Sequence, residues 1–318
     1  MTQIVLLVSG NEGAQRYLLC DRTAHRLDAV AESYPEIEEG QIAPISAINY
    51  ASRDGTKIPA ILTWPLGVDT TEARRDLPLL VLPHGRPESY DSIRFDWWAQ
   101  YFARKGYLIL QPNFRGSTGF GSAHRQAGRG QWGKLMQDDL ADGVQTLTAA
   151  GYADPDRVCI MGASYGGYAA LAGGAFDAEL YRCIIAVAGV SDLPRMLSDE
   201  RRYSGSDHWV VAYWEKLVGD SKEDKARLLE VSPVEHAEAY RAPVLLLHGD
   251  QDTVVPIVQS SRMARALRRA NRRVEFVELD GEDHWLSQSE TRIAMLRENS
   301  AFLARNDPVR AEASGSAR

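Results

Sequence analysis

The chain has 318 residues, of which 44% are apolar and 25% charged, proportions typical of a soluble globular protein with a buried core. Its formal net charge of −7 disfavours nucleic acid and anionic membranes as the main partners, because those surfaces attract basic patches. No apolar run approaches the roughly 18 residues of a membrane span, and the N-terminus lacks the basic region and cleavage site of a secretory signal.

The sequence changes character near residue 45. Residues 1–34 hold three short β-like runs separated by polar turns, which predicts an antiparallel meander. From about Ile45, apolar strand-like runs alternate with longer amphipathic segments, the pattern of a mostly parallel eight-stranded sheet with helices on both faces. The predicted strands are residues 47–52, 57–65, 77–85, 107–114, 157–164, 183–189, 243–250 and 274–281. The predicted helices are residues 91–106 (N-capped by Asp91), 132–151, 257–271 and 286–305.

The number and spacing of the three cysteines indicate the redox environment of the protein. Cys20, Cys159 and Cys183 are an odd number with no C-x-x-C spacing. Cys159 and Cys183 fall inside apolar runs, which predicts buried free thiols. Because a reducing compartment keeps thiols free, this pattern favours a cytoplasmic protein.

A serine lies between glycines at the end of the fifth predicted strand. Gly162, Ser164 and Gly166 form the pattern G-x-S-x-G. A hydroxyl is a weak nucleophile unless it is exposed beside a base, and a sharp strand-to-helix turn gives that exposure, with flanking glycines leaving room for the neighbouring backbone. The motif predicts a nucleophilic Ser164, although a glycine-rich bend would read the same.

Two later loops offer an acid and a base in the chain order Ser, acid, His. Asp250 and Asp252 follow the seventh predicted strand, and His284 follows the eighth. These side chains belong at the same edge of the sheet as Ser164, where open α/β sheets bind ligands. Asp252 is the preferred acid, because Asp250 directly follows a His-Gly pair and could instead cap the turn. His248 is predicted to be a packed loop histidine.

An oxyanion hole needs two donors aimed at the developing negative charge. The backbone N–H of Tyr165, directly after the serine, is one candidate, and the loop at residues 83–92 should supply the other. No His/Cys cluster has metal-ligand spacing, so neither a metal nor an organic cofactor is expected.

Together these motifs resemble the catalytic α/β-hydrolase domain of the prolyl oligopeptidase family of serine peptidases, most closely its acylaminoacyl-peptidase-like branch. The matching pieces, in family order from about residue 45 to 302, are "SRDGTKIPAILTWP", "LPHGRP", "FARKGYLILQPNFRGSTGFG", "DDLADGVQTL", "DPDRVCIMGASYGGYAAL", "AGVSDL", "HGDQDTVVP" and "GEDHWL". The resemblance implies Ser164 as nucleophile, Asp252 as acid and His284 as base. It also implies the backbone N–H of Arg86 as the second oxyanion donor.

The chain departs from the family in the loop "HGRP", where members usually read H-G-G-P. A backbone donor survives this change, but Arg86 adds a long cation near the pocket mouth, which could bind a substrate carboxylate, narrow the entrance or point to solvent. His84, at the start of the loop, could be a side-chain donor. Two further residues that match recurrent family positions, Arg115 and Asp139, are expected to form a buried ion pair that braces loops.

The insertion at residues 188–220, after the sixth predicted strand, is rich in aromatic residues. Tyr203, Trp209, Tyr213 and Trp214 could line an apolar pocket, as such insertions do in the family, or could be the apolar face of a helix.

The domain division follows from the same resemblance, because family members typically carry a β-propeller before the hydrolase domain. Residues 1–44 are expected to be a β-rich segment and linker left from such a propeller, residues 45–306 the catalytic domain, and residues 307–318 a disordered tail.

The combined prediction is a serine hydrolase that cleaves peptide or acyl-peptide bonds of short peptides through an acyl-enzyme. A carboxylesterase acting on short-chain esters is the alternative, because the same machinery cleaves esters. A non-catalytic binding protein of this fold is a third reading, which the intact triad disfavours. The expected partner is a short peptide or small ester. The sequence does not determine the oligomeric state, and a homo-oligomer is one of the states it allows.

Overall fold

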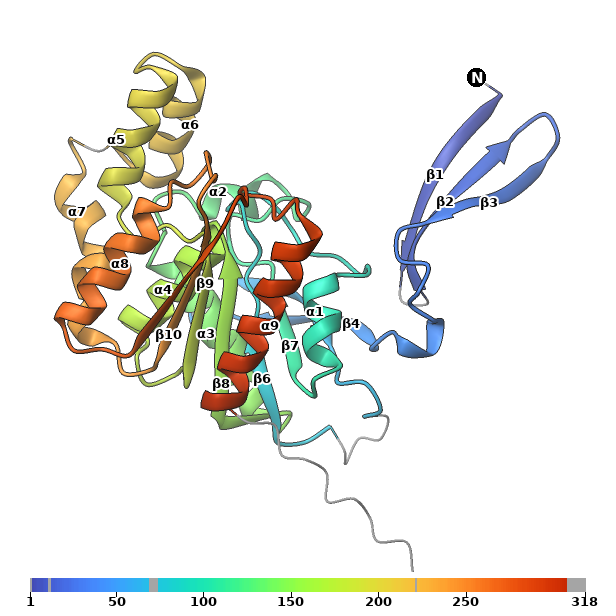
Figure 1. Ribbon diagram of the computed structural model, residues 1–318, viewed down its shortest axis with the longest axis horizontal. Helices are drawn as coiled ribbons and strands as arrows, with labels where there is room; N and C mark the ends of the chain where they lie inside the picture. The colour runs from blue at the N-terminus through green and yellow to red at the C-terminus, as the bar shows by residue number, and fades with distance from the viewer. Residues whose placement is uncertain (1, 11–12, 69–73, 221, 308–318) are drawn as a thin grey trace, which may run out of the picture.

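The computed structural model describes residues 2–10, 13–68, 74–220 and 222–307 (Figure 1). The predicted disordered tail therefore lies outside the described residues, except for Asp307. That residue is buried, and its carboxylate lies 3.1 Å from the guanidinium of Arg157. The division between residues 44 and 45 stays a prediction. No helix in the described part of the chain has the length and apolar character to cross a membrane.

The N-terminal meander is present as predicted. Strands β1 (Gln3–Gly10), β2 (Gly13–Asp21) and β3 (Arg26–Glu32) form an antiparallel sheet in the order β1-β2-β3. Figure 1 shows this small sheet standing apart from the larger one. Many of its apolar side chains are exposed, Val5 and Leu7 among them.

The larger sheet has eight strands and is mostly parallel, as predicted. Its order is β11-β10-β9-β8-β6-β7-β5-β4, with antiparallel pairing where β5 meets β4 and β7. Its central strands are buried along their whole length because helices cover both faces. The strands are β4 (Ile45–Ala51), β5 (Lys57–Thr63), β6 (Leu77–Val81), β7 (Leu108–Pro112), β8 (Ala153–Ala163), β9 (Cys183–Val187), β10 (Val244–Gly249) and β11 (Val274–Leu279).

Helices pack on the two faces of this sheet in two separate cores. Helices α1 (Trp97–Ala103) and α9 (Ser289–Asn306) cover one face, around Phe102 and Phe302. Helices α3 (Leu135–Ala149), α4 (Tyr165–Phe176) and α8 (Val258–Arg269) cover the other. The remaining helices are α2 (Ser122–Ala127), α5 (Leu193–Ser204), α6 (Trp209–Val218) and α7 (Lys225–Glu230), together with the 3-10 turns η1 (Glu39–Gln41) and η2 (Pro233–Ala239). Helices α5 and α6 form the insertion at residues 188–220, which rises at the upper left of Figure 1.

The predicted cap of the first helix is wrong. Helix α1 begins at Trp97, and its N-cap is Asp96, whose Oδ1 accepts hydrogen bonds from the amides of Trp98 and Ala99 at 3.0 and 2.9 Å. Asp91 lies in the preceding loop with a buried side chain. Both aspartates precede the same apolar pattern, so residue type alone does not show which of them is the N-cap.

The expectation of two free buried thiols is also wrong. Cys159 on β8 and Cys183 on β9 form a disulfide with their Cα atoms 4.8 Å apart, and Cys20 is the free cysteine. The two residues are direct register partners in adjacent parallel strands, so their side chains share one face of the sheet. Register between strands is a tertiary property that the spacing of cysteines in the sequence does not reveal.

Candidate active site

Ser164 occupies a sharp turn between the end of β8 and the start of α4. Its φ of 58° and ψ of −118° lie where side-chain-bearing residues are strained, a feature that clusters at functional sites. The amide of Ser164 donates to the carbonyl of Val187 on β9 at 2.9 Å, which holds the turn against the sheet. This geometry is the one that the G-x-S-x-G motif predicted.

The flanking glycines allow this turn because the backbone passes too close for a side chain. A Cβ on Gly162 would lie 2.4 Å from the carbonyl oxygen of Gly166, and one on Gly166 would lie 2.2 Å from the carbonyl oxygen of Pro83. Both distances are far below a van der Waals contact. Gly166 therefore lets the elbow approach the loop after β6.

The acid and base meet across two loops at the same sheet edge. Nδ1 of His284 lies 2.7 Å from Oδ2 of Asp252, and the other carboxylate oxygen accepts from the amides of Val254 and Val255 at 2.8 Å. Both side chains are largely buried, at 6% and 0% exposed. Because Nδ1 is occupied by the carboxylate, Nε2 of His284 is the nitrogen left for a serine hydroxyl.

Asp252 has a second histidine partner that sequence reasoning did not assign to it. Nε2 of His248 lies 3.3 Å from Oδ2 of Asp252 and 2.7 Å from the carbonyl of Val255, while its Nδ1 lies 2.7 Å from Oγ of Ser260. Burial alone would raise the pKa of the Asp252 carboxyl, but the hydrogen bonds from His248 and His284 hold that pKa below its usual range. The carboxylate is therefore ionised throughout the physiological range. His248 is fully buried, in agreement with the predicted packed histidine.

Asp250, the rejected acid, has a different role in the loop. Its Oδ1 accepts from the amide of Gly281 at 2.7 Å, so it joins the acid loop to the start of the histidine loop. This bond reaches the neighbouring loop and is not the cap of its own turn that the sequence analysis considered for Asp250. The buried Glu282 anchors the same region, with its Oε1 accepting from the amide of Asp283 at 2.9 Å.

The predicted oxyanion loop lies directly against the elbow. A Cβ on Gly85 would be 3.2 Å from the carbonyl oxygen of Ala163 and 3.6 Å from Cβ of Ser164. Among the described residues, neither the amide of Tyr165 nor that of Arg86 has a hydrogen-bond acceptor. Tyr165 is the first residue of α4, where amides lack intrahelical partners, so both donors are available to a ligand.

His84 braces this loop and is not placed as the side-chain donor considered above. Its Nδ1 lies 3.1 Å from the carbonyls of both Gly85 and Arg86, and its Nε2 lies 2.9 Å from Oγ of Ser117. Since carbonyls only accept, Nδ1 carries the proton and Nε2 accepts from the serine. Burial lowers the pKa of His84 to about 4, so the ring is neutral at pH 7.

Arg86 is exposed, and its side chain lies against an aromatic ring. Its guanidinium carbon lies 5.2 Å from the ring centroid of Trp285, the residue after His284. The φ of Arg86 is 56°, a left-handed conformation that glycine adopts far more readily.

A cavity of about 810 Å³ opens above the elbow and gathers most of the predicted site residues. Ser164, His284 and the loop residues His84 and Arg86 line it, as do Trp209 and Trp214 of the insertion. Tyr213 is not among the residues that line it. It packs against Trp214 with ring centroids 5.1 Å apart and lies beside Glu88 of the loop at residues 83–92. Lining residues that the sequence analysis did not assign to the site include Tyr90, Trp97 and Trp285.

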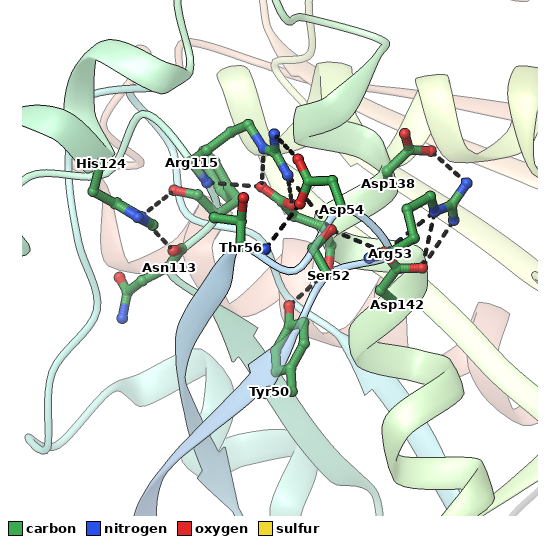
Figure 2. A network of polar contacts seen from close by, with 12 residues as sticks. Tyr50, Ser52, Arg53, Asp54, Thr56, Asn113, Arg115, His124, Asp138 and Asp142 are labelled. Carbon is green, nitrogen blue, oxygen red and sulfur yellow. Dashed lines mark hydrogen bonds and ion pairs between the residues drawn. The ribbon is translucent and has the colours of Figure 1, made fainter.

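A buried ion-pair network behind the cavity holds the loop after β7 (Figure 2). Arg115 donates from Nε and Nη2 to the Asp139 carboxylate at 2.9 and 2.7 Å, and from Nη1 to Asp54 at 2.8 Å. The Arg115 and Asp139 side chains are 4% and 0% exposed. The predicted brace is confirmed, and it reaches the site because Ser117, two residues further on, contacts His84.

Comparisons with known proteins agree with this architecture. The profile of the prolyl oligopeptidase family matches residues 93–307. The chain is 34% identical over 316 residues to dipeptidyl aminopeptidase BIII of Pseudoxanthomonas mexicana, covering 98% of this chain and 45% of that protein. It is 29% identical over 257 residues to the acylamino-acid-releasing enzyme of Arabidopsis thaliana, covering 78% of this chain and 33% of that protein.

Solved structures show the same relationship. A puromycin-hydrolysing peptidase of Mycobacterium tuberculosis superposes with a TM-score of 0.88 at 26% identity, over 98% of this chain and 47% of that chain. The acylaminoacyl peptidase of Pyrococcus horikoshii shares the fold, with a TM-score of 0.83 at 21% identity over 98% of this chain and 49% of that one. The chain thus spans less than half the length of these relatives.

Proposed function

Because the chain belongs to the prolyl oligopeptidase family of serine peptidases, we propose that it hydrolyses peptide bonds of short peptides through an acyl-enzyme on Ser164. The observation that carries this proposal is the pairing of His284 with the buried Asp252, in one cavity with a serine on a strained elbow. The names of two relatives, an aminopeptidase and an acylamino-acid-releasing enzyme, support amide bonds as the target.

In this mechanism Ser164 Oγ attacks the carbonyl carbon of the scissile bond while Nε2 of His284 accepts its proton. The tetrahedral intermediate collapses as the imidazolium returns that proton to the leaving amine. Water then attacks the acyl-enzyme by the same steps, releasing the acid product and restoring Ser164. Asp252 holds the imidazole in the required tautomer and stabilises its charged form.

The oxyanion of each intermediate would accept hydrogen bonds from the amides of Tyr165 and Arg86. Loss of one such donor typically costs on the order of 3 kcal/mol in the barrier. His84 supports this role indirectly, because it fastens the carbonyls on either side of the Arg86 amide. Trp209 and Trp214 supply apolar surface for the acyl side of the substrate.

The cytoplasmic location and a homo-oligomer stay predictions. The cytoplasmic prediction was based on free thiols at Cys159 and Cys183. Their disulfide removes that basis, since disulfides persist in oxidising compartments.

The test compares peptidyl anilides with short-chain nitrophenyl esters, alongside labelling by a fluorophosphonate probe. We expect the wild type to be labelled and to cleave anilides, and Ser164→Ala to lose both. Labelling that persists in Ser164→Ala, or none in the wild type, would refute the acyl-enzyme. Turnover of esters alone would assign the chain to the carboxylesterases, and absence of all turnover with an unlabelled serine would favour the non-catalytic binding protein.

A further inference from the structure

Arg86 and Trp285 meet at the mouth of the cleft and join its two catalytic loops. The guanidinium carbon lies 5.2 Å from the Trp285 ring centroid, and that ring meets the His284 ring edge-on, with centroids 5.2 Å apart at 88°. A cation at this distance from an indole face is attracted to it. The contact therefore holds the arginine beside the proposed general acid.

The charge of Arg86 is left for a ligand. No carboxylate lies within 4.0 Å of its guanidinium among the described residues, and the nearby Glu88 pairs instead with Arg125 at 3.8 Å. Arg94, the other cation lining the cavity, lies near the carboxyls of Asp91 and Asp96, whose pKa values burial raises despite its charge. Within the part of the chain that the structure describes, neither cation of the cleft wall has a carboxylate within 4.0 Å, and Arg86 is the one that Trp285 holds beside His284.

The position of Trp285 indicates which half of a substrate this cation faces. His284 must return its proton to the leaving nitrogen, so that nitrogen lies at the imidazole. The amino acid that departs with the nitrogen extends past His284 along its loop, toward Trp285 and Arg86. When this amino acid is the last of the peptide, its α-carboxylate carbon lies about 2.5 Å beyond the nitrogen.

The backbone conformation at Arg86 supports a functional role for its side chain. A left-handed φ of 56° suits glycine, and any other residue there is held under strain. Arginine also differs from lysine in offering a planar fork that binds carboxylates with two hydrogen bonds.

From these contacts we infer that Arg86, held over Trp285, binds the free carboxylate of the leaving residue, which makes peptides ending one residue beyond the cleaved bond the preferred substrates. This subsite rests on the proposed peptidase function and names the substrate class within it.

The test measures kcat/KM for alanyl-phenylalanyl-alanine and for the same peptide with a C-terminal amide, following release of alanine or alaninamide by mass spectrometry. We expect the wild type to favour the free acid by about tenfold, as a charge-assisted hydrogen bond allows. The ratio of the two substrates cancels any general damage to the oxyanion hole. Raising the ionic strength should reduce this ratio in the wild type, because salt screens an exposed ion pair.

Matched variants then assign the preference to the side chain. Arg86→Gln and Arg86→Lys must both hold the left-handed backbone, but only the lysine keeps the charge, so we expect the ratio to fall to about one in the first and to stay several-fold in the second. Trp285→Leu should lower it partly. Arg125→Gln, which removes a cation from the same region but not from the cavity wall, should leave it unchanged.

The outcomes separate the two proposals. A wild-type ratio near one, or a ratio that persists in Arg86→Gln, overturns the carboxylate subsite while leaving the peptidase intact. Failure of the wild type to cleave either peptide or any anilide overturns the peptidase function, and the subsite with it.

Discussion

Asp252 and His284 are 32 residues apart in the sequence, yet Oδ2 of the first and Nδ1 of the second lie 2.7 Å apart at the edge of the sheet. Their strands, β10 and β11, are parallel neighbours, so the loops that follow them begin side by side. Gly249 at the end of β10 permits this approach, because a Cβ there would lie 2.2 Å from the carbonyl oxygen of Glu282.

The first prediction separates the two candidate acids. Asp252→Asn should reduce kcat on a peptidyl anilide by roughly 10⁴-fold, because an amide cannot hold the imidazole tautomer or stabilise its charge. Asp250→Asn keeps an oxygen that can accept from the Gly281 amide, and it should stay within a few-fold of the wild type. Equal losses in the two variants, or the reverse order, would show that the wrong acid has been chosen.

The second prediction concerns the elbow glycine. Gly166→Ala places a methyl group 2.2 Å from the Pro83 carbonyl, so it should destabilise the fold by about 1–3 kcal/mol although alanine favours helices. Activity should fall as well, since Pro83 begins the oxyanion loop. Thermal unfolding measures the first effect. Gly40→Ala, where no atom lies within 4 Å of the new Cβ, is the control.

The third prediction addresses the brace in Figure 2. Asp139→Asn leaves the buried Arg115 guanidinium without its main counter-charge and should cost about 3–5 kcal/mol of unfolding free energy. The adjacent Asp138→Asn removes a more exposed pair with Arg53 and should cost at most about 1 kcal/mol. Urea unfolding measures the loss in each variant. Similar losses would mean that burial does not determine how much each ion pair contributes to the unfolding free energy.

The fourth prediction is a pH dependence. Burial, with help from the charge of Asp96, raises the pKa of the Asp91 carboxyl to about 8, and its Oδ2 has no hydrogen-bond partner. The unfolded chain ionises this group near pH 4, so between about pH 4 and 8 the folded state holds one more proton and its stability falls as pH rises.

The variant Asp91→Asn lacks this titration. The difference in unfolding free energy, variant minus wild type, should therefore increase as pH rises from about 4 to 8. A constant difference caused by the amide itself would not change this trend. Parallel curves of unfolding free energy against pH would contradict the raised pKa. The comparison needs only chemical denaturation at several pH values.

The fifth prediction tests the disulfide. In denaturant without reductant, one thiol per chain, that of Cys20, should react with a thiol reagent, and three should react after reduction. Reduction should also lower the unfolding midpoint, since closing a loop with a sequence separation of 24 typically stabilises a fold by about 3 kcal/mol. Three reactive thiols before reduction would restore the original expectation of free cysteines.

Local patterns in the sequence were enough for the elements and for the order of the triad. All eight strands of the large sheet were predicted because each is a short apolar run bounded by turn residues, and Ser164 stands in a motif whose strand and helix flanks are visible in the sequence. The start of α1 was missed because Asp91 and Asp96 both suit a cap, and packing of the apolar face decides between them.

The sequence by itself determined the fold class, the family and the three residues proposed to carry the chemistry, because these depend on local periodicity and on short motifs. Only the tertiary structure decided which side chains touch. It paired Cys159 with Cys183 through strand register, brought His84 to Ser117 and set Arg86 over Trp285. Each of these contacts joins segments distant along the chain, and their geometry follows from how the sheet and its loops pack.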